Sequence, residues 1–336
     1  MSLRDVLIVG AGPSGLATAI AAKQLGLDHL VLERGTLVDG IYRFPPQMVF
    51  FTTPELLEIG GLPMTSPYEK PTRDEALRYY RRVVDTHQVQ VVLHEEVTGI
   101  EREAHGSDTV FVVESRTPRG VTRARHARAV VLAMGYFEHP NLLGVPGEDL
   151  PHVSHFYGEA HAHYRQRVVV VGGKNSACEA ALELYRAGVD VTLVHRHGAV
   201  GDSVKYWVRP DIENRIAEGS IRARFQTRVM EIRPSSVIVA PAGEGAPSHT
   251  EEIAADAVLL LTGYHADPEF LRRAGVEVDD ESWAPRYDPE TFETNVPNLF
   301  VAGGQVAGKR TGSIFIENGR FHGEAIARTL AARFGG

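Results

Sequence analysis

The chain of 336 residues is long enough for two domains of ordinary size, and its 43% hydrophobic residues suffice for a sizeable core. A formal net charge of −8 and the absence of an evident Lys/Arg cluster argue against a nucleic-acid partner. The single cysteine, Cys178, excludes an internal disulfide, a Cys-x-x-Cys redox pair and a four-thiolate iron–sulfur site. The first apolar run is broken by Gly10 and no run approaches the ~20 residues of a membrane helix, so we expect a cytoplasmic protein without membrane attachment.

The first predicted elements are a strand, a glycine turn and a helix. Residues 6–9 are apolar, Gly10, Gly12 and Gly15 follow in the spacing G-x-G-x-x-G, and residues 16–26 read as an Ala-rich helix. This order predicts a mononucleotide-binding unit. Gly10 permits the tight turn, Gly12 lets a pyrophosphate approach the backbone, and Gly15 lets the helix pack against the strand. Free N–H groups and the positive end of the helix dipole then face the phosphates.

The second predicted strand, residues 29–33, ends in Glu33, whose carboxylate can accept hydrogen bonds from a ribose diol. Residues 34–64 are rich in Gly, Pro and aromatic residues, and we expect no regular element there before Pro54. A long loop in this place often lines a site. Four aromatic side chains suit either packing beside a flat cofactor or filling the core beneath the loop: Tyr42, Phe44, Phe50 and Phe51.

Alternating helices and strands follow, which predicts an α/β fold class. Thr72 and Glu75 form a capping-box pattern at the start of a helix over 72–84. The basic stretch 116–128 contains Pro and Gly and looks like a solvated hairpin. Strands are expected at 89–93, 97–102, 110–115 and 129–135.

The segment 142–164 is rich in Pro and Gly, and its composition suits a crossing between domains. It also contains four histidines: His152, His155, His161 and His163. Because no acid or thiol stands at a matching ligand spacing, we favour a polar connecting segment over a metal site and expect no metal.

Residues 167–197 form a second predicted strand–turn–helix–strand unit, with its helix over 180–185. The glycine pattern is altered: Lys174 replaces the second glycine of the pattern, and Ala177 is an accepted variant of the third. Lys174 either meets a phosphate or is a solvated turn residue. Cys178, among alanines of this helix, is expected to be a small buried hydrophobe, with a reactive thiol as the alternative.

The strand after this helix ends in His195, Arg196 and His197, where an NAD site would have an acid. A carboxylate would repel a ribose 2′-phosphate, whereas Arg196 can bind it through two hydrogen bonds. The sequence therefore favours NADPH over NADH at the second turn.

The chain crosses near 136–145 and again near 262–268, and it ends with a strand and glycine turn at 298–308 and a helix from about Glu317. We expect two Rossmann-like domains: a discontinuous FAD-binding domain of residues 1–137 and 263–336, and an inserted NADPH-binding domain of residues 138–262. The flavin would take a hydride from the nicotinamide and pass electrons to an acceptor, so we expect no catalytic side chain for the first half-reaction.

Short motifs throughout the chain carry a resemblance to known proteins: GAGPSG at 10–15, AMG at 133–135, GGKNSA at 172–177, HR at 195–196, TG at 262–263 and AGG at 302–304. With these the chain resembles flavoproteins of the low-molecular-weight thioredoxin reductase type over essentially its whole length. Within that group it is most similar to the bacillithiol-disulfide reductase family, on the segments IYRFP (41–45), FFTTPELLEIG (50–60), GGKNSACEAALEL (172–184) and IFIENGRFHG (314–323). The resemblance implies FAD, NADPH, a homodimer or homotetramer, and a small disulfide or small redox protein as acceptor.

The expected cofactor-binding residues form two sets. The set expected at FAD comprises Gly10, Gly12, Pro13, Ser14, Gly15, Glu33, Arg34, Tyr42, Phe51, Thr52, Val97, Gly135, Gly303, Phe315 and Ile316. The set expected at NADPH comprises Gly172, Gly173, Lys174, Asn175, Ser176, His195, Arg196 and Gly263. The resemblance implies that Val97 lies near the adenine and that Phe315 and Ile316 begin a helix near the isoalloxazine.

Three departures from the related proteins bear on the acceptor. The missing Cys-x-x-Cys makes direct thioredoxin reduction unexpected. Gly304 stands where many relatives have an Asp that holds the ribityl chain, so that contact must come from backbone or water. Ser14 stands where proposed bacillithiol-disulfide reductases carry a Cys, and a hydroxyl is a weak nucleophile without activation.

Two alternatives therefore stay open. One is a ferredoxin or flavodoxin–NADP reductase, which needs no cysteine. The other is a slow-turnover, NADPH-binding redox sensor. The net charge of −8 disfavours docking of an acidic ferredoxin unless a local basic patch overrides it.

Overall fold

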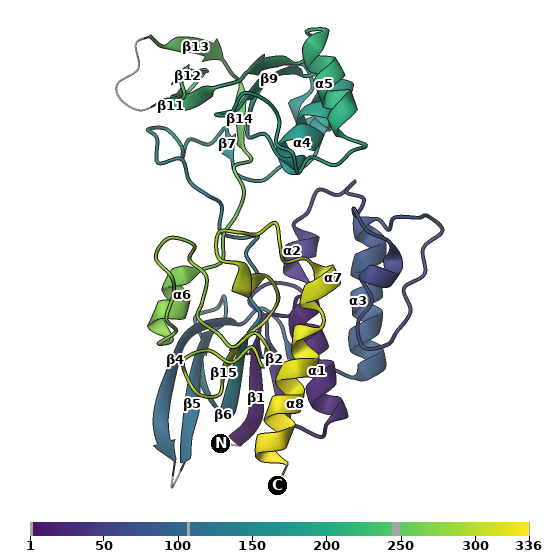
Figure 1. Cartoon of the computed structure of the whole chain (residues 1–336), viewed down its shortest axis with the longest axis vertical. Coiled ribbons are helices and arrows are strands. Elements are labelled where there is room, and N and C mark those ends of the chain that lie inside the picture. The colour runs from purple at the N-terminus through teal and green to yellow at the C-terminus, as the bar shows by residue number, and fades with distance from the viewer. Residues whose placement is uncertain (1–2, 106–107, 244–248, 336) are drawn as a thin grey trace. The chain divides into compact units, whose positions relative to one another are not determined.

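The computed structural model describes residues 3–105, 108–243 and 249–335. The chain divides into two compact units (Figure 1): a discontinuous unit of Met1–His139 and Tyr264–Gly336, and an inserted unit of Pro140–Gly263. No helix among the described residues is long and apolar enough to cross a membrane.

The discontinuous unit is built on one seven-stranded sheet of order β3-β2-β1-β6-β5-β4, in which β15 also pairs with β6. Its parallel strands are β1 (Leu3–Val9), β2 (His29–Leu32), β3 (Val91–Val92), β6 (Thr122–Leu132) and β15 (Leu299–Val301). The antiparallel strands β4 (Glu96–His105) and β5 (Asp108–Arg116) extend the sheet beyond β6.

The helices of this unit cover the parallel strands, and α1 and α8 lie side by side (Figure 1). They are α1 (Pro13–Gln24), α2 (Asp39–Tyr42), α3 (Arg73–His87), α6 (Pro268–Arg273), α7 (Ile316–Gly319) and α8 (His322–Phe334), with 3-10 turns η1 (Pro54–Leu56) and η3 (Gly303–Ala307). The capping box predicted for α3 is confirmed: Thr72 Oγ1 accepts the Glu75 N–H at 3.3 Å, and the Glu75 carboxylate accepts the Thr72 N–H at 2.7 Å.

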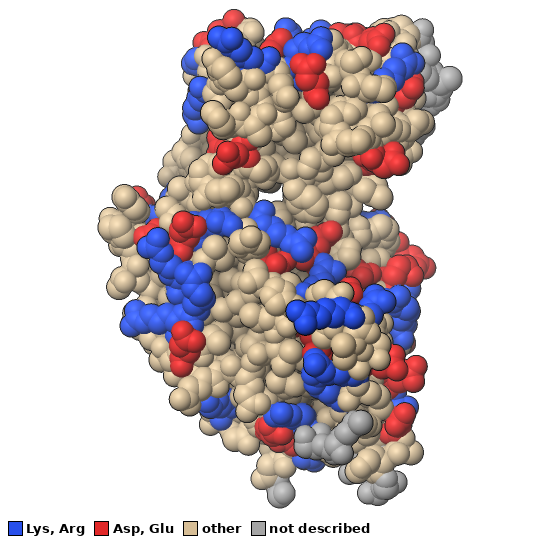
Figure 2. Space-filling view, turned by 180° about the vertical axis from the view of Figure 1, so that it is seen from behind, with Lys and Arg blue, Asp and Glu red and all other residues tan. Residues whose placement is uncertain are grey.

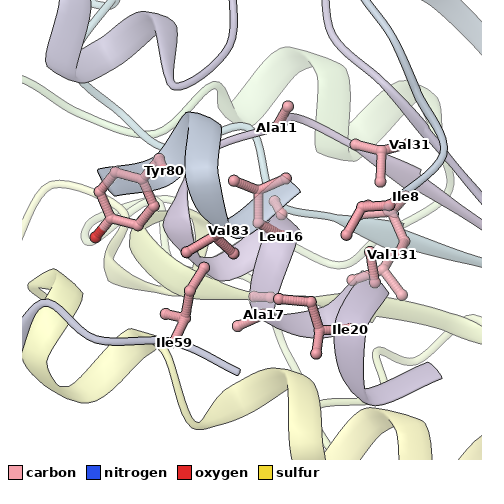
Figure 3. Close-up of a cluster of buried hydrophobic side chains, with 14 of the residues drawn as sticks. Ile8, Ala11, Leu16, Ala17, Ile20, Val31, Ile59, Tyr80, Val83 and Val131 are labelled. Atoms are coloured by element: carbon pink, nitrogen blue, oxygen red, sulfur yellow. The ribbon is translucent and has the colours of Figure 1, made fainter. Parts of the chain in front are cut away.

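A hydrophobic cluster joins the sheet to α1 and α3 (Figure 3). Ile8 and Val131 come from neighbouring strands, Leu16 and Ile20 from α1, and Tyr80 from α3, and all are almost completely buried. Burial of each such side chain contributes ~1.5–3 kcal/mol relative to exposure, so this cluster fixes α1 against the end of β1.

The inserted unit contains a five-stranded parallel sheet of order β10-β9-β8-β14-β7 and a three-stranded antiparallel sheet. Its parallel strands are β7 (Val153–Ser154), β8 (Arg167–Val171), β9 (Asp190–Val194), β10 (Arg222–Arg224) and β14 (Ala257–Leu260). The antiparallel strands are β11 (Thr227–Arg233), β12 (Ser236–Pro241) and β13 (Glu251–Ala254). The helical elements are α4 (Asn175–Arg186), α5 (Arg209–Ala217) and the 3-10 turn η2 (Ala160–His163).

Cys178 lies on the buried side of α4 with no exposed surface. Burial raises the pKa of its thiol to about 12, so the thiol is neutral at ordinary pH. Its interpretation as a small buried hydrophobe is confirmed.

Both helices that follow a glycine turn begin earlier than the sequence predicted. We expected α1 from residue 16 and α4 from residue 180, whereas they begin at Pro13 and Asn175. Pro13 is preorganised for the first helical position, and Gly12 is the extended N-cap. Ser14, Asn175 and Ser176 therefore lie in first helical turns, where N–H groups are free of helical partners.

Two loop predictions were also wrong. Residues 39–42 form the one-turn helix α2, stabilised by Asp39, which accepts the Thr36 N–H at 3.1 Å and pairs with Arg43 Nε at 2.5 Å. The segment 142–164 is more than a connection, because it supplies β7 to the parallel sheet and forms η2. The basic stretch 116–128, by contrast, is confirmed as an exposed hairpin: Arg116 of β5 pairs with Thr122 of β6, and the Thr117 N–H donates to the Val121 carbonyl at 3.0 Å across the turn.

Two strand and helix ends also differ. The strand expected over 129–135 leaves the sheet after Leu132, and Gly135 adopts a φ of 73°. The C-terminal helix is interrupted between α7 and α8. At this break the Arg320 guanidinium donates to the carbonyls of Glu55 and Glu58, at 2.7 Å each, which ties the break to the η1 segment.

Candidate functional site

The carboxyl ends of neighbouring parallel strands bring three predicted glycines to one edge of the larger sheet. Gly10 follows β1, Gly135 lies shortly after β6, and Gly303 lies shortly after β15. In open α/β sheets, ligands bind in the crevice outside the carboxyl ends of the strands. This edge is therefore the candidate site of the discontinuous unit.

The glycine turn after β1 has the geometry that a bound phosphate requires. A Cβ at Gly10, whose φ is 105°, would lie 2.5 Å from the Ala133 carbonyl oxygen, and one at Gly15 would lie 2.0 Å from the Gly10 carbonyl oxygen. Only glycine fits at these two positions. A Cβ at Gly12 would meet nothing within 4 Å, so the N-terminus of α1 faces open space. The chain thus provides a cradle for an anion at a helix N-terminus.

Glu33, at the end of β2, is only 8% exposed and holds the turn in place. Its carboxylate accepts the Ala11 N–H at 2.7 Å and the Gly35 N–H at 2.8 Å. Burial raises the pKa of Glu33, and the two N–H donors oppose that shift. The acid predicted to receive a ribose diol therefore also organises the backbone around Ala11, a role that the sequence analysis missed.

Ser14 lies in the first turn of α1, against two glycines of the C-terminal segment. A Cβ at Gly303 would lie 2.4 Å from Ser14 Oγ, and a Cβ at Gly319 would lie 3.1 Å from it. The Gly303 N–H donates to His322 Nδ1 at 3.1 Å, and burial lowers the pKa of His322 to about 4. His322 is therefore a neutral acceptor at ordinary pH, and it fixes η3 beside the first turn of α1.

The ring of Tyr136 explains why position 304 is a glycine. A Cβ at Gly304 would lie 2.6 Å from the Tyr136 ring, so a larger side chain has no room there. The Asp that many relatives carry at this position is thus incompatible with the Tyr136 ring where it lies.

The loop residues predicted beside a cofactor are in different environments. Phe50 is buried in the core, whereas the Tyr42 side chain is 55% exposed and its carbonyl accepts from Arg73 at 2.5 Å. Phe51 is half-buried and Thr52 is buried.

Arg34 forms ion pairs with Glu138 and Glu96, of which Glu138 was not foreseen in the sequence.

The remaining residues expected at FAD lie on β4 and at the start of α7. Val97, near the start of β4, is buried in the core. Phe315 is the N-cap of α7 and is 50% exposed, and Ile316 is the first residue of that helix.

The second glycine turn, in the inserted unit, is equally tight. A Cβ at Gly172, whose φ is 146°, would lie 2.5 Å from the Leu261 carbonyl oxygen. A Cβ at Gly173 would lie 2.5 Å from the His195 ring, so this glycine is needed for the ring to approach.

Lys174 is the exposed N-cap of α4. Gly263, with a φ of 93°, accepts the Asn141 N–H at 2.9 Å.

Asn175 binds a loop that sequence reasoning had not connected with this turn. Its Oδ1 accepts the Lys205 N–H at 2.9 Å, and its Nδ2 donates to the Ser203 carbonyl at 3.1 Å. The Gly201 N–H donates to the Gly173 carbonyl at 2.7 Å. The segment 201–205 is therefore hydrogen-bonded to the turn. Ser176, which follows Asn175, is exposed.

Arg196 is exposed just beyond β9, and no carboxylate of the described residues pairs with it within 4 Å. Its Nε lies 3.3 Å from His197 Nε2. The pKa of His195 is lowered by burial and by the neighbouring His197 and Arg196. The end of this strand is therefore cationic or neutral, in contrast to Glu33 at the matching place in the other unit. The described residues contain no group of three or more His, Cys, Asp or Glu placed to hold a metal ion.

The chain belongs to the pyridine nucleotide-disulphide oxidoreductase family, whose pattern matches residues 7–303. It is a flavoprotein oxidoreductase with a mixed α/β fold of the thioredoxin-reductase type, and its one cysteine rules out a Cys-x-x-Cys pair. Family membership implies a flavin and NAD(P)H as cofactors.

Two relatives are similar over the full length. The bacilliredoxin reductase Bdr of Bacillus subtilis is 41% identical over 333 residues, which cover 99% of both chains. The solved structure of the bacillithiol disulfide reductase Bdr from Bacillus cereus matches with a TM-score of 0.93 and 39% identity, covering 99% of this chain and 100% of that one. The resemblance predicted from the sequence is thereby confirmed. A thioredoxin reductase of T. acidophilum, with a TM-score of 0.75 at 19% identity, shares the fold alone.

Proposed function

We propose that the discontinuous unit binds FAD and that the inserted unit binds NADPH. The support is the contrast between two similar turns. Glu33 stands beside the first, where a ribose diol needs an acceptor, and exposed Arg196 stands beside the second, where a 2′-phosphate needs a cation. The two nucleotide turns predicted from the sequence would thus hold two different cofactors.

The proposed FAD site uses backbone groups for phosphate and Glu33 for ribose. Gly12, Pro13 and Ser14 place the N-terminus of α1 toward the pyrophosphate, and Gly135 and Gly303 border it from the neighbouring strand ends. In the inserted unit, Gly172 and Gly173 allow the tight turn that directs the N-terminus of α4 toward the NADPH pyrophosphate, and Arg196 binds the 2′-phosphate. When bound, the flavin accepts a hydride from the nicotinamide and passes electrons to the acceptor.

We further propose that the acceptor is a bacillithiol-containing disulfide, either bacillithiol disulfide itself or a bacilliredoxin. The single observation that carries this choice is the 41% identity to a bacilliredoxin reductase over 99% of both chains. A homodimer or homotetramer remains part of the proposal.

The chain itself offers no thiolate for a mixed disulfide with that acceptor. Cys178 is fully buried with a pKa of about 12, and position 14 carries a hydroxyl. Among the described residues, no carboxylate or imidazole that could activate the Ser14 hydroxyl forms a hydrogen bond with it. The proposed reduction therefore proceeds without a covalent intermediate on the protein.

An acceptor panel tests this function. FAD-loaded protein is mixed with NADPH and, in separate reactions, with bacillithiol disulfide, oxidised bacilliredoxin, ferredoxin, flavodoxin or a quinone, and NADPH consumption is followed. We expect turnover with a bacillithiol-containing acceptor, and the same turnover after alkylation with iodoacetamide. Turnover with ferredoxin or flavodoxin alone would replace the proposal by a ferredoxin or flavodoxin–NADP reductase, and turnover with none would favour a redox sensor.

A further inference from the structure

One exposed face of α3 carries three arginines that the sequence analysis did not recognise as a cluster. Two tyrosines separate Arg78 from Arg81 and Arg82 in the sequence, but the spacing i, i+3, i+4 places the three arginines on one side of a helix. All three are exposed. Figure 2 shows Lys and Arg side chains gathered over α3 on that face of the discontinuous unit. We call Arg78, Arg81 and Arg82 the arginine face.

The acids of α3 neutralise the arginine face only in part. Asp74 pairs with Arg73 at 3.2 Å, and Glu75 is hydrogen-bonded to Thr72 and Ser66 but also interacts electrostatically with Arg78. Asp85 is the remaining exposed acid on this side of the helix, and no described acid lies within 4 Å of the three guanidinium groups. The face therefore carries a local positive charge on a chain whose net charge is −8.

The opposite side of α3 holds the helix rigidly. The Tyr79 hydroxyl accepts the Ile59 N–H at 2.8 Å, and the Tyr80 hydroxyl donates to the Leu57 carbonyl at 2.9 Å. At the helix N-terminus, Arg73 donates to the Tyr42 carbonyl at 2.5 Å, in the loop expected beside the flavin. The arginine face is thus a preorganised surface on the unit that we propose to hold FAD.

We propose that the arginine face docks a small redox protein with an acidic surface, which accepts the electrons. This inference rests on the proposed function, which requires an acceptor. Complementary charge speeds encounter and orients the partner, and weak electron-transfer complexes bury less than ~1,200 Å², an area within reach of one helix face and its surroundings. The arginine face can attract a partner with a local acidic patch. A long polyanion would bind less well, because the rest of this negatively charged chain would repel it.

The test compares a protein acceptor with a small neutral one. Oxidised bacilliredoxin and, separately, an acidic ferredoxin are the protein probes, and benzoquinone is the neutral probe. The variants are the triple change Arg78→Glu, Arg81→Glu, Arg82→Glu, the milder triple change of the same residues to Gln, and the control Arg119→Glu. Arg119 is exposed in the turn between β5 and β6, and no described acid lies within 4 Å of it. NADPH oxidation is measured between ~25 mM and ~300 mM NaCl, where screening of surface charges changes strongly.

For the wild-type chain we expect kcat/KM with at least one protein probe to fall ~10-fold over this salt range. At low salt the Glu triple variant should lose ~10-fold in kcat/KM, mainly through KM, and the Gln variant should lose less. Arg119→Glu should match the wild type, and all variants should reduce benzoquinone alike.

The docking proposal would be overturned if the Glu triple variant kept the same kcat/KM as the wild-type chain with both protein probes. It would also be overturned by a loss that equals the loss with benzoquinone, or by a loss that Arg119→Glu reproduces. A wild-type chain that reduces benzoquinone but neither protein probe would also overturn it, while leaving FAD and NADPH binding intact. Failure of the wild-type chain to take up FAD or to oxidise NADPH with any acceptor would instead overturn the proposed function.

Discussion

At the scale of single residues, the two nucleotide turns differ most at the end of the second strand of each unit. Glu33 is buried and engaged by two backbone N–H groups, whereas Arg196 is exposed and unpaired with any described carboxylate. The first arrangement builds a fixed acceptor, and the second leaves a guanidinium available to a phosphate. Cofactor choice in this account therefore depends on Arg196 more than on the glycines.

Arg196→Ala should raise the KM for NADPH by ~10–100-fold, because a charge-assisted hydrogen bond contributes ~1.5–3 kcal/mol. The KM for NADH, which has no 2′-phosphate, should change little. The control is Arg186→Ala, at the far end of α4, where the guanidinium pairs with Asp211 at 2.5 Å. Steady-state kinetics with a quinone acceptor measure both constants. An unchanged NADPH KM in Arg196→Ala would show that another group recognises the phosphate.

The sequence predicted the glycine roles because G-x-G-x-x-G names both the turn and the close packing, and the contacts of Gly10 and Gly15 agree with it. It did not predict the surroundings of Ser14 or Asn175. Ser14 faces Gly303 and Gly319, and Asn175 binds the 203–205 loop. Those partners are distant in sequence and carry no local pattern.

At the scale of elements, the antiparallel strands β5 and β6 are joined by a buried acid. Glu95, just before β4, is 1% exposed and receives hydrogen bonds from Arg123, Arg125 and Ser115 Oγ, the last at 2.6 Å. Burial by itself raises the pKa of Glu95, but these donors together hold it at about 2. The two arginines belong to the basic stretch 116–128, which the sequence predicted to be a solvated hairpin.

The turn of this hairpin was predictable from its Pro and Gly, whereas the ion pairs to Glu95 were not, because Glu95 lies 28 and 30 residues away in the sequence. Pairing with β5 and these ion pairs stabilise the hairpin. The capping box of α3, by contrast, is local, and so it was visible in the sequence.

Because the folded-state pKa of Glu95 is depressed, its contribution to stability is present above the unfolded pKa near ~4.3 and is lost as the pH falls toward about 2. Glu95→Gln should lower the free energy of unfolding by ~2–3 kcal/mol at neutral pH, and this difference should shrink as the pH approaches 2. Chemical unfolding at several pH values measures it.

The matched control for that experiment is Glu96→Gln. The Glu96 side chain is 46% exposed and makes long ion contacts, 3.9 Å to Arg34 and 3.8 Å to Arg116. An exposed pair contributes ~0–1 kcal/mol, so the control should change stability little at any pH. Equal losses in the two variants would contradict the role assigned to the buried carboxylate.

At the scale of the whole molecule, the chain has two compact units, each with a glycine turn at the carboxyl end of a parallel strand. Hydrophobic periodicity and glycine spacing were sufficient to predict an α/β chain with two such turns. The distribution of surface charge was not predictable in the same way. A net charge of −8 conceals the arginine face, which exists only once residues 78–82 are wound into a helix.

The central claim, that one unit holds FAD and the other delivers NADPH to it, is tested most directly by anaerobic rapid mixing. Purified, FAD-loaded protein is mixed with NADPH or NADH without any acceptor, and the visible flavin absorbance is followed. We predict rapid bleaching by NADPH with a saturable rate, and bleaching at least ~10-fold slower with NADH at the same concentration. A chain that takes up no FAD, a flavin that NADPH does not bleach, or equal rates with both nucleotides would contradict the account.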